Sequence, residues 1–356
     1  MSRVLPSLAC LLALSAVQAQ ELAPSPSPSP SPSASPSPQA QPTTVISQEV
    51  KEVFERSAKA VVKIRAVDEH GTLFGTGFFI DPAGTLYTAY SVAGDADDFT
   101  VEFDGKEVPA RLVMADARSE IALLKIDMPT PALPIGKSHN LEVTTPVLTV
   151  GFPLDLPQTP SFGMIAGFDK KYLGKFFSTT KVRANLATQR GEAGAPLLNF
   201  KGEVVGILLS AVDNGSACYA LPIDAAEKIR SDFVRFGEVR HGWIGINVAA
   251  AERAVDGSRA QFTEIMRNTP AAESGVKEGD ILLQVGKTPV HEPEDVIDAS
   301  FYITAGDPVP ITVMRGKEKM TFTIEAGFHP LSQHPPIIAS PLSPSQPMPL
   351  GLDRTP

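Results

Sequence analysis

Cysteine, tryptophan and long apolar runs are scarce in this sequence. Its 356 residues include two cysteines, Cys10 and Cys218, and one tryptophan. Cys10 lies in an N-terminal segment with the features of a removable leader, so Cys218 would remain alone and an intramolecular disulfide is excluded. No segment beyond that leader has the roughly 20 uninterrupted apolar residues of a membrane helix, so we expect no membrane span.

Clusters of basic residues are missing as well. The formal net charge at pH 7 is -9, whereas proteins that bind nucleic acid usually carry a basic patch, so we expect no nucleic-acid partner. Histidine, cysteine and acidic residues do not cluster at the spacings of metal ligands, so we expect no metal and no cofactor. The length and the 43% hydrophobic content suit two globular domains with additional segments.

The N-terminus predicts export. Arg3 precedes a mostly apolar stretch, residues 4–17, that is too short to span a bilayer, and small residues follow up to Ala19. This pattern is typical of a secretory signal peptide over residues 1–19. A lipid anchor at Cys10 is the alternative, although the preceding residues match a lipobox poorly. We expect an exported protein of the periplasm or cell envelope.

Two further segments are rich in proline and serine. Residues 20–46 form a predicted linker, in which alternating Pro and Ser between Pro24 and Pro42 favour an extended polyproline-II spacer of about 60 Å. This spacer would serve either as a stalk that holds the globular part off a surface or as a solvated linker without a partner. Residues 329–356 lack hydrophobic periodicity and predict a disordered tail.

Residues 47–237 predict a β-rich domain. Residues 47–58 carry apolar side chains at helical spacing, and from Val61 onward short strands alternate with turn residues. Regular short strands of this kind indicate a sandwich or a barrel. Residues 224–236 predict a closing helix that Gly237 caps.

Three motifs in this region follow one another in the order of a known protease family. Residues 73–84 contain GTGFFI before an Asp-Pro turn, residues 116–125 read DARSEIALLK, and residues 191–196 read GEAGAP before the segment KGEVVGI. Together they resemble the chymotrypsin-fold serine proteases of the HtrA/Deg family, whose nucleophile turn reads Gly-Asn-Ser-Gly-Gly-Pro. The resemblance implies a mainly β fold, with a chymotrypsin-like double β-barrel followed by an α+β PDZ domain.

The same resemblance places unexpected residues where the family has its catalytic triad. Ser91 stands in the place of the histidine base, Glu120 in the place of the aspartate, and Ala193 in the place of the serine nucleophile. A methyl group has no lone pair with which to attack a carbonyl, and a serine hydroxyl is not basic near neutral pH. We therefore expect a pseudoprotease, not an enzyme, in which Ser91, Glu120 and Ala193 are degenerate triad positions.

No substitute for the missing base is visible. Glu120 has no imidazole to orient, so its predicted role is to accept a hydrogen bond from Ser91 or a backbone amide, or to remain solvated. The histidines are expected at the surface and not at the cleft; they stand at positions 70, 139, 241, 291, 329 and 334.

An oxyanion-hole remnant is expected at Gly191, Glu192 and Ala193, because backbone amides survive the loss of side chains. Glu192 is expected to repel an anionic product there. Residues 206–210 resemble the strand that lines the substrate cleft in the family, and an extended peptide is expected to lie along it by strand addition.

Residues 238–328 resemble the PDZ domain of the same proteases. GWIGI at residues 242–246 is similar to the family's carboxylate-binding loop, and residues 269–282 are similar to its Ser-Pro-Ala-Ala-x-x-Gly-Leu-x-x-Gly-Asp-x-Ile motif. The resemblance implies that amides of this loop hold a peptide C-terminus that adds a strand beside it, next to a helix over residues 292–303. The expected peptide-binding residues are Trp243, Ile244, Gly245 and Ile246. A domain that serves only packing or oligomer contacts is the alternative.

These features predict an exported HtrA-like pseudoprotease that binds unfolded or C-terminal peptide segments as an adaptor or chaperone-like protein, without peptide hydrolysis. One alternative is a serine endopeptidase of protein quality control with an atypical active site, whose nucleophile would be a serine such as Ser91 or Ser210. Another is a structural envelope protein in which the Pro/Ser segment matters most. Family members often form trimers through an N-terminal aromatic segment, for which Phe54 is a poor match.

Overall fold

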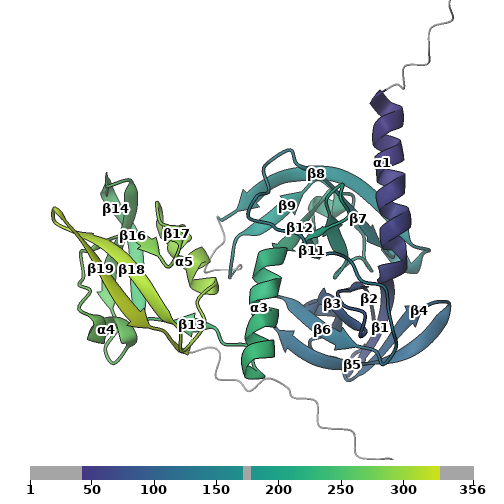
Figure 1. The fold of residues 1–356 in the computed structure, drawn as a ribbon, viewed down its shortest axis with the longest axis horizontal. Coiled ribbons are helices and arrows are strands. Elements are labelled where there is room, and N and C mark those ends of the chain that lie inside the picture. Colours follow the sequence, from purple (N-terminus) through teal and green to yellow (C-terminus); the bar gives the residue numbers. More distant parts are fainter. Residues whose placement is uncertain (1–41, 171–177, 329–356) are drawn as a thin grey trace, which may run out of the picture. The chain divides into compact units, whose positions relative to one another are not determined.

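A computed structural model describes residues 42–170 and 178–328 of the chain (Figure 1). The predicted signal peptide, most of the predicted linker and the predicted tail, with His329 and His334, lie outside the described residues. The described residues from Thr43 onward belong to one compact unit.

The first β-barrel closes in the strand order β1-β2-β3-β6-β5-β4. Its strands are β1 (Val61–Asp68), β2 (Gly71–Phe79), β3 (Thr85–Ala89), β4 (Asp98–Phe103), β5 (Lys106–Asp116) and β6 (Ile121–Lys125). Helix α1 (Pro42–Ser57) and the 3-10 turn η1 (Ala58–Ala60) precede it, and the short helix α2 (Tyr90–Ala93) follows β3. In β1, Val62, Ile64 and Ala66 alternate with less buried residues and point into the core, as the two-residue period of a strand requires.

The second barrel closes in the order β10-β11-β12-β9-β8-β7. Its strands are β7 (Pro146–Gly151), β8 (Thr159–Asp169), β9 (Lys181–Ala184), β10 (Pro196–Leu198), β11 (Val204–Val212) and β12 (Ala217–Pro222), with 3-10 turns η2 (Pro153–Asp155) and η3 (Asp213–Gly215). Helix α3 (Ile223–Phe236) follows and ends at Gly237, whose φ is 75° and whose amide donates to Phe233 O at 2.8 Å. Glycine suits this left-handed cap because it has no Cβ.

The remaining described residues form a smaller α+β domain with its own hydrophobic core. Its elements are β13 (Gly242–Trp243), β14 (Ile246–Val255), β15 (Ser258–Ile265), α4 (Pro270–Ser274), β16 (Ile281–Val285), β17 (Thr288–Pro289), α5 (Pro293–Phe301), β18 (Pro308–Arg315), β19 (Glu318–Glu325) and β20 (Gly327–Phe328). The main sheet has the order β14-β15-β16-β18-β19, so β14 lies at one edge.

The predicted fold class is confirmed: the chain is mainly β, with two closed six-stranded barrels followed by a PDZ domain. The helix expected over residues 47–58 begins earlier, at Pro42, and the helix expected over residues 292–303 ends at Phe301. Phe54 packs against the core of the first barrel. Trimer formation through an aromatic segment therefore stays a prediction without support from this side chain.

Candidate functional site

The turn at residues 191–196 depends on two glycines. Gly191 and Gly194 have φ angles of 94° and 89°, a region that side chains with a Cβ rarely occupy. A Cβ at Gly191 would lie 2.4 Å from Phe152 O, and one at Gly194 would lie 2.2 Å from Thr76 O. Both positions therefore need glycine, for their backbone conformation and because a Cβ has no space there.

Hydrogen bonds orient the backbone of this turn. Each carbonyl oxygen of residues 190–193 accepts a hydrogen bond from the protein. The donors, in chain order, are Leu154 N (2.7 Å), Thr76 Oγ1 (2.7 Å), Ala195 N (3.0 Å) and Thr76 N (2.9 Å). The amides of Gly191 and Ala193, in contrast, donate to no acceptor among the described residues. The turn thus leaves two donors available, as an oxyanion hole requires.

Two of the three triad positions lie in one cleft. Ser91, on α2, and Ala193, on the turn, both line a cavity of about 490 Å³. Its other lining residues are Thr72, Leu73, Phe74, Val92, Leu154, Asp155, Arg190 and Gly191. No histidine or cysteine is among these lining residues, so the cleft in the described part of the chain offers hydroxyl groups but no imidazole or thiol.

The third triad position, Glu120, has a different partner from the expected one. Its carboxylate forms an ion pair with the ammonium group of Lys181, whose side chain is fully buried. The expected hydrogen bond with Ser91 or a backbone amide does not occur among the described residues, although the Glu120 side chain remains 43% exposed to solvent. A buried ammonium needs a nearby opposite charge, because an unpaired buried ion is strongly unfavourable. No motif in the sequence marked Lys181 as this partner.

The carboxyl group of Glu192 turns away from the cleft. Glu192 is 1% exposed, and its Oε2 accepts a hydrogen bond from the amide of Gln189 at 2.7 Å. Burial raises the pKa of Glu192 above its ordinary value, because desolvation disfavours the charged form. The expectation that Glu192 repels an anion in the cleft is therefore wrong.

The described histidines lie away from the cleft, but one of them is buried. His139 is exposed and its Nδ1 lies 2.9 Å from Asp224 Oδ2. His241 was expected at the surface, yet it is 4% exposed, and its Nε2 lies 2.8 Å from Asp116 Oδ1. The Asp116 carboxylate offsets the free-energy cost of burying the polar His241 ring. No pattern in the sequence indicated this pairing. Within residues 42–170 and 178–328, no group of three or more metal-binding side chains occurs.

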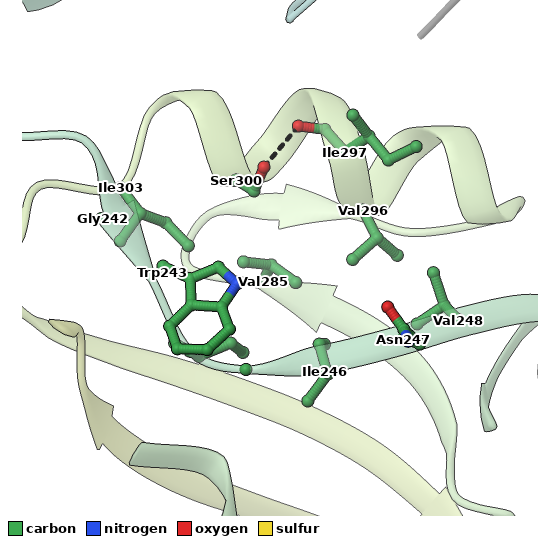
Figure 2. Close-up of a pocket in the computed structure, with 12 residues that line it drawn as sticks. Gly242, Trp243, Ile246, Asn247, Val248, Val285, Val296, Ile297, Ser300 and Ile303 are labelled. Carbon is green, nitrogen blue, oxygen red and sulfur yellow. Dashed lines mark hydrogen bonds between the residues drawn. The ribbon is translucent and has the colours of Figure 1, made fainter. Parts of the chain in front are cut away.

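A second hollow lies between β14 and α5 in the smaller domain. It has a volume of about 210 Å³. The four predicted binding residues line it, together with Gly242, Asn247, Val248, Val285, Val296, Ile297, Ser300 and Ile303. Figure 2 shows α5 on one side and the edge strand β14 on the other, with the Trp243 indole at one end. Ser300 Oγ donates to Ile297 O at 2.7 Å, so this hydroxyl is already used within the helix.

The loop at the end of this groove presents free amides. Ile244 O accepts from Ala271 N at 2.9 Å, and Gly245 O accepts from Met266 N at 3.0 Å. The amides of Ile244 and Gly245 donate to no acceptor among the described residues. Gly245 has a φ of 85°, and a Cβ there would lie 2.4 Å from Cβ of Thr269. The fold therefore requires glycine at this position and leaves two donors at the groove.

Two sequence families match the chain. A trypsin-like peptidase domain matches residues 75–207, which include Ser91, Glu120 and Ala193. A PDZ domain matches residues 242–326, which include the groove.

Curated relatives match most of the chain. A probable periplasmic serine endoprotease of the DegP-like type from Halomonas elongata is 29% identical over 272 residues, covering 73% of this chain and 57% of the relative. The protein of the same name from Rhizobium meliloti is 27% identical over 280 residues, covering 75% of this chain and 55% of the relative. The chain thus spans little more than half the length of these relatives.

Solved structures match both domains. The HtrA-type protease AlgW, solved with a tripeptide, is 25% identical with a TM-score of 0.69, covering 79% of this chain and 97% of that one. The serine endoprotease from Yersinia pestis is 25% identical with a TM-score of 0.59, covering 79% of this chain and 98% of that one.

These comparisons correct one prediction. The prediction that the chain is not an enzyme is contradicted, because the relatives are named serine endoproteases and the solved neighbours are HtrA-type proteases. No helix of the described residues is long and apolar enough to cross a membrane. With a trypsin-like peptidase domain followed by a PDZ domain, the chain is similar to DegP-like serine endoproteases and HtrA-type proteases.

Proposed function

We propose that this protein captures C-terminal and unfolded segments of other proteins in its PDZ groove, as part of protein quality control in the cell envelope. One observation carries the proposal: the apolar groove lies against the outer edge of β14 and ends at the free amides of Ile244 and Gly245. The name of the relatives, which includes the word periplasmic, supports the location.

The groove suits a peptide that adds a strand to the sheet. β14 is an edge strand, so its outer backbone groups are available to pair with an extended chain. The amides of Ile244 and Gly245 would then donate hydrogen bonds to the terminal carboxylate, because charged acceptors form the stronger hydrogen bonds with backbone donors. Ile246 and Val296 line the hollow in which the last side chain of the ligand would lie.

Trp243 provides a direct test, because it is the one tryptophan in the sequence and it lines the groove. A peptide with an apolar C-terminal residue and a free carboxylate is titrated into the purified protein while indole emission is recorded. We expect saturable binding that weakens at least about tenfold when the same peptide is amidated.

The matched variants lie on the same strand. Ile246→Glu places a negative charge in the groove and is expected to abolish the change in emission, whereas Val255→Glu, at an exposed position of β14 outside the groove, is expected to preserve it. Equal binding of the acid and the amide would contradict carboxylate capture. If neither peptide changes the indole emission, the domain is better explained as one that serves only packing or oligomer contacts.

A second candidate function is peptide hydrolysis, which the name of the relatives favours. Ala193 offers no nucleophile, so hydrolysis would have to use another group, and Ser91 is the serine that lines the cleft. Turnover of an unfolded protein is compared between the purified chain and its Ser91→Ala variant. If the parent hydrolyses the substrate and the Ser91→Ala variant does not, Ser91 is the nucleophile. If both hydrolyse it, Ser91 is excluded as the nucleophile.

A further inference from the structure

We propose that Glu192 is a pH-dependent positioning residue: its buried carboxyl group keeps the turn at residues 189–194 closed while it carries a proton, and the turn opens when that proton is lost. The proposal concerns the double barrel and does not depend on peptide capture in the PDZ groove. It rests on the burial of the carboxyl group, on the few partners that it has, and on its place in the turn.

The carboxyl group of Glu192 lies in the interior. The residue is 1% exposed. A Cβ built on Gly151, at the end of β7, would lie 3.3 Å from Glu192 Oε1 and 3.4 Å from Thr76 Oγ1 on β2. The carboxyl group is therefore packed against the second barrel, close to the strand of the first barrel that reaches the turn.

The interior offers this carboxyl group one hydrogen bond. Oε2 accepts from the amide of Gln189 at 2.7 Å, whereas Oε1 is buried without a hydrogen-bond partner among the described residues. Thr149 Oγ1 is buried and unpartnered as well, and Thr149 lies two residues before Gly151, on the same face of β7. A buried carboxylate needs several donors or a cation, whereas a protonated carboxyl group is neutral and can itself donate.

The strands around Glu192 supply no cation for a carboxylate. Strands β2, β7, β10 and β11 contain no titratable residue. On β9, Lys181 and Arg183 form ion pairs with Glu120 and Asp169. A negative charge on Glu192 would therefore remain uncompensated among the described residues.

Two nearby groups do not change this balance. Arg190 is exposed and lines the cleft, whereas the Glu192 carboxyl group turns to the interior. On β12, burial raises the pKa of the Cys218 thiol to about 11, and the charge of Glu192 contributes to that rise. Burial likewise raises the pKa of Glu192 above its ordinary 4.5, because desolvation disfavours the charged form.

The same residue fixes the backbone of the turn. The amide of Glu192 donates to Gln189 O at 3.3 Å, and its carbonyl oxygen accepts from Ala195 N at 3.0 Å. Together with the side-chain bond to Gln189 N, three hydrogen bonds of one residue close the turn. Hydration of an ionised carboxylate requires the side chain to leave the interior, so the backbone that bears it, and the cleft wall at Ala193, move with it.

The sign of the effect follows from proton binding. Between its ordinary pKa and its raised pKa, Glu192 binds more protons in the closed, folded chain than in the unfolded chain. Stability therefore falls as the pH rises through this interval, which begins near 4.5, and levels off above it. Local opening of the turn, which hydrates the carboxyl group, is favoured over the same interval.

Hydrogen exchange of the Gly194 and Ala195 amides measures this opening, because in the closed turn they donate to Leu208 O and Glu192 O. Glu192→Gln keeps the shape of the side chain and an oxygen for the Gln189 amide, but it cannot ionise. We expect nearly equal exchange in parent and variant at pH 5, and about tenfold faster exchange in the parent at pH 8. Comparing the two proteins at each pH cancels the intrinsic effect of pH on exchange.

Two further variants separate charge from other effects. Glu192→Met is also uncharged and similar in volume, but it lacks the acceptor for the Gln189 amide, so loss of the pH dependence in both variants assigns the effect to the charge. Glu142→Gln is the control, since Glu142 is an exposed residue in the loop before β7, and it should exchange like the parent at both pH values.

Three results would overturn the proposal. The first is a ratio of exchange rates between parent and Glu192→Gln that is the same at pH 5 and pH 8. The second is a pH dependence that Glu192→Met retains in full. The third is an equal effect of Glu142→Gln and Glu192→Gln, which would make the response a property of net charge and not of the buried carboxyl group.

Discussion

The ammonium group of Lys181, on β9 of the second barrel, lies against the carboxylate of Glu120, in the turn before β6 of the first barrel. Lys181 is fully buried, whereas the side chain of Glu120 is 43% exposed. Burial lowers the pKa of Lys181, while the nearby carboxylates of Glu120 and Asp116 raise it. Glu120, the predicted acid position of the triad, therefore stabilises a buried charge that links the two barrels.

Glu120→Gln is expected to lower the free energy of unfolding by about 2 kcal/mol, because it removes a carboxylate from a buried ammonium group. Water at the half-exposed Glu120 position keeps the loss below the range for fully buried pairs. Urea denaturation measures the effect, with Glu69→Gln as the control, since that carboxylate is 85% exposed. Equal stability of the two variants would show that the ion pair contributes nothing measurable.

The pair of Asp116 and His241 predicts a dependence of stability on pH. Burial alone raises the pKa of Asp116, but the hydrogen bonds from His241 and Ser119 outweigh it and hold the pKa below 3.8. A carboxyl group whose pKa is lower in the folded state adds stability above its unfolded pKa and loses it as the pH falls through the folded pKa. We therefore expect Asp116→Asn to flatten the loss of stability below about pH 4.

Denaturation from pH 7 to pH 2 measures this slope. Asp97→Asn serves as the control, because Asp97 is exposed and its replacement should leave the slope of the parent unchanged. If Asp116→Asn and the parent lose stability in parallel below pH 4, the lowered pKa of Asp116 plays no part in acid unfolding.

Gly245→Ala is expected to destabilise the PDZ domain by about 2–3 kcal/mol and to weaken capture of peptides. Two effects contribute: a φ of 85°, and a distance of 2.4 Å between the added Cβ and Cβ of Thr269. Gly257→Ala is the matched control, because its φ is 84° but no atom lies within 4 Å of the added Cβ. Thermal denaturation of both variants separates the cost of the strained backbone angle, which both share, from the cost of the steric overlap with Thr269, which only Gly245→Ala has. Equal losses of stability would mean that Thr269 moves aside at no cost.

Placing the family's triad residues at the three predicted positions tests whether the cleft is arranged as in a protease. The variant with Ser91→His, Glu120→Asp and Ala193→Ser is expected to hydrolyse an unfolded protein at least about 100-fold faster than a control with the first two changes alone, because only the former has both base and nucleophile. The expectation rests on Ser91 and Ala193 sharing one cleft and on the free amides. Equal rates in folded variants would show that the spacing of the cleft no longer supports acyl transfer.

Local patterns in the sequence predicted much of the architecture. The glycines at 191, 194 and 245 mark backbone positions with positive φ and no room for a Cβ, so the turn at Ala193 and the loop at the PDZ groove were visible as motifs. Short strands separated by turn residues from Val61 onward predicted a barrel or a sandwich, and the two-residue period of a strand explains why Val62, Ile64 and Ala66 face the core. The groove residues, in contrast, followed from the resemblance of residues 242–246 to the carboxylate-binding loop of PDZ domains.

What only the tertiary structure decided was how charges pair across the fold. Glu120 meets Lys181 from another barrel, and His241 meets Asp116. These partners lie tens to more than a hundred residues apart, and no periodicity or motif connects them. The sequence by itself determined the turns, the strands and the identities of the residues at the cleft, because these depend on neighbours along the chain. The direction and partner of each charged side chain depend on which distant groups the packed barrels bring within reach, because burial makes an unpaired charge unfavourable.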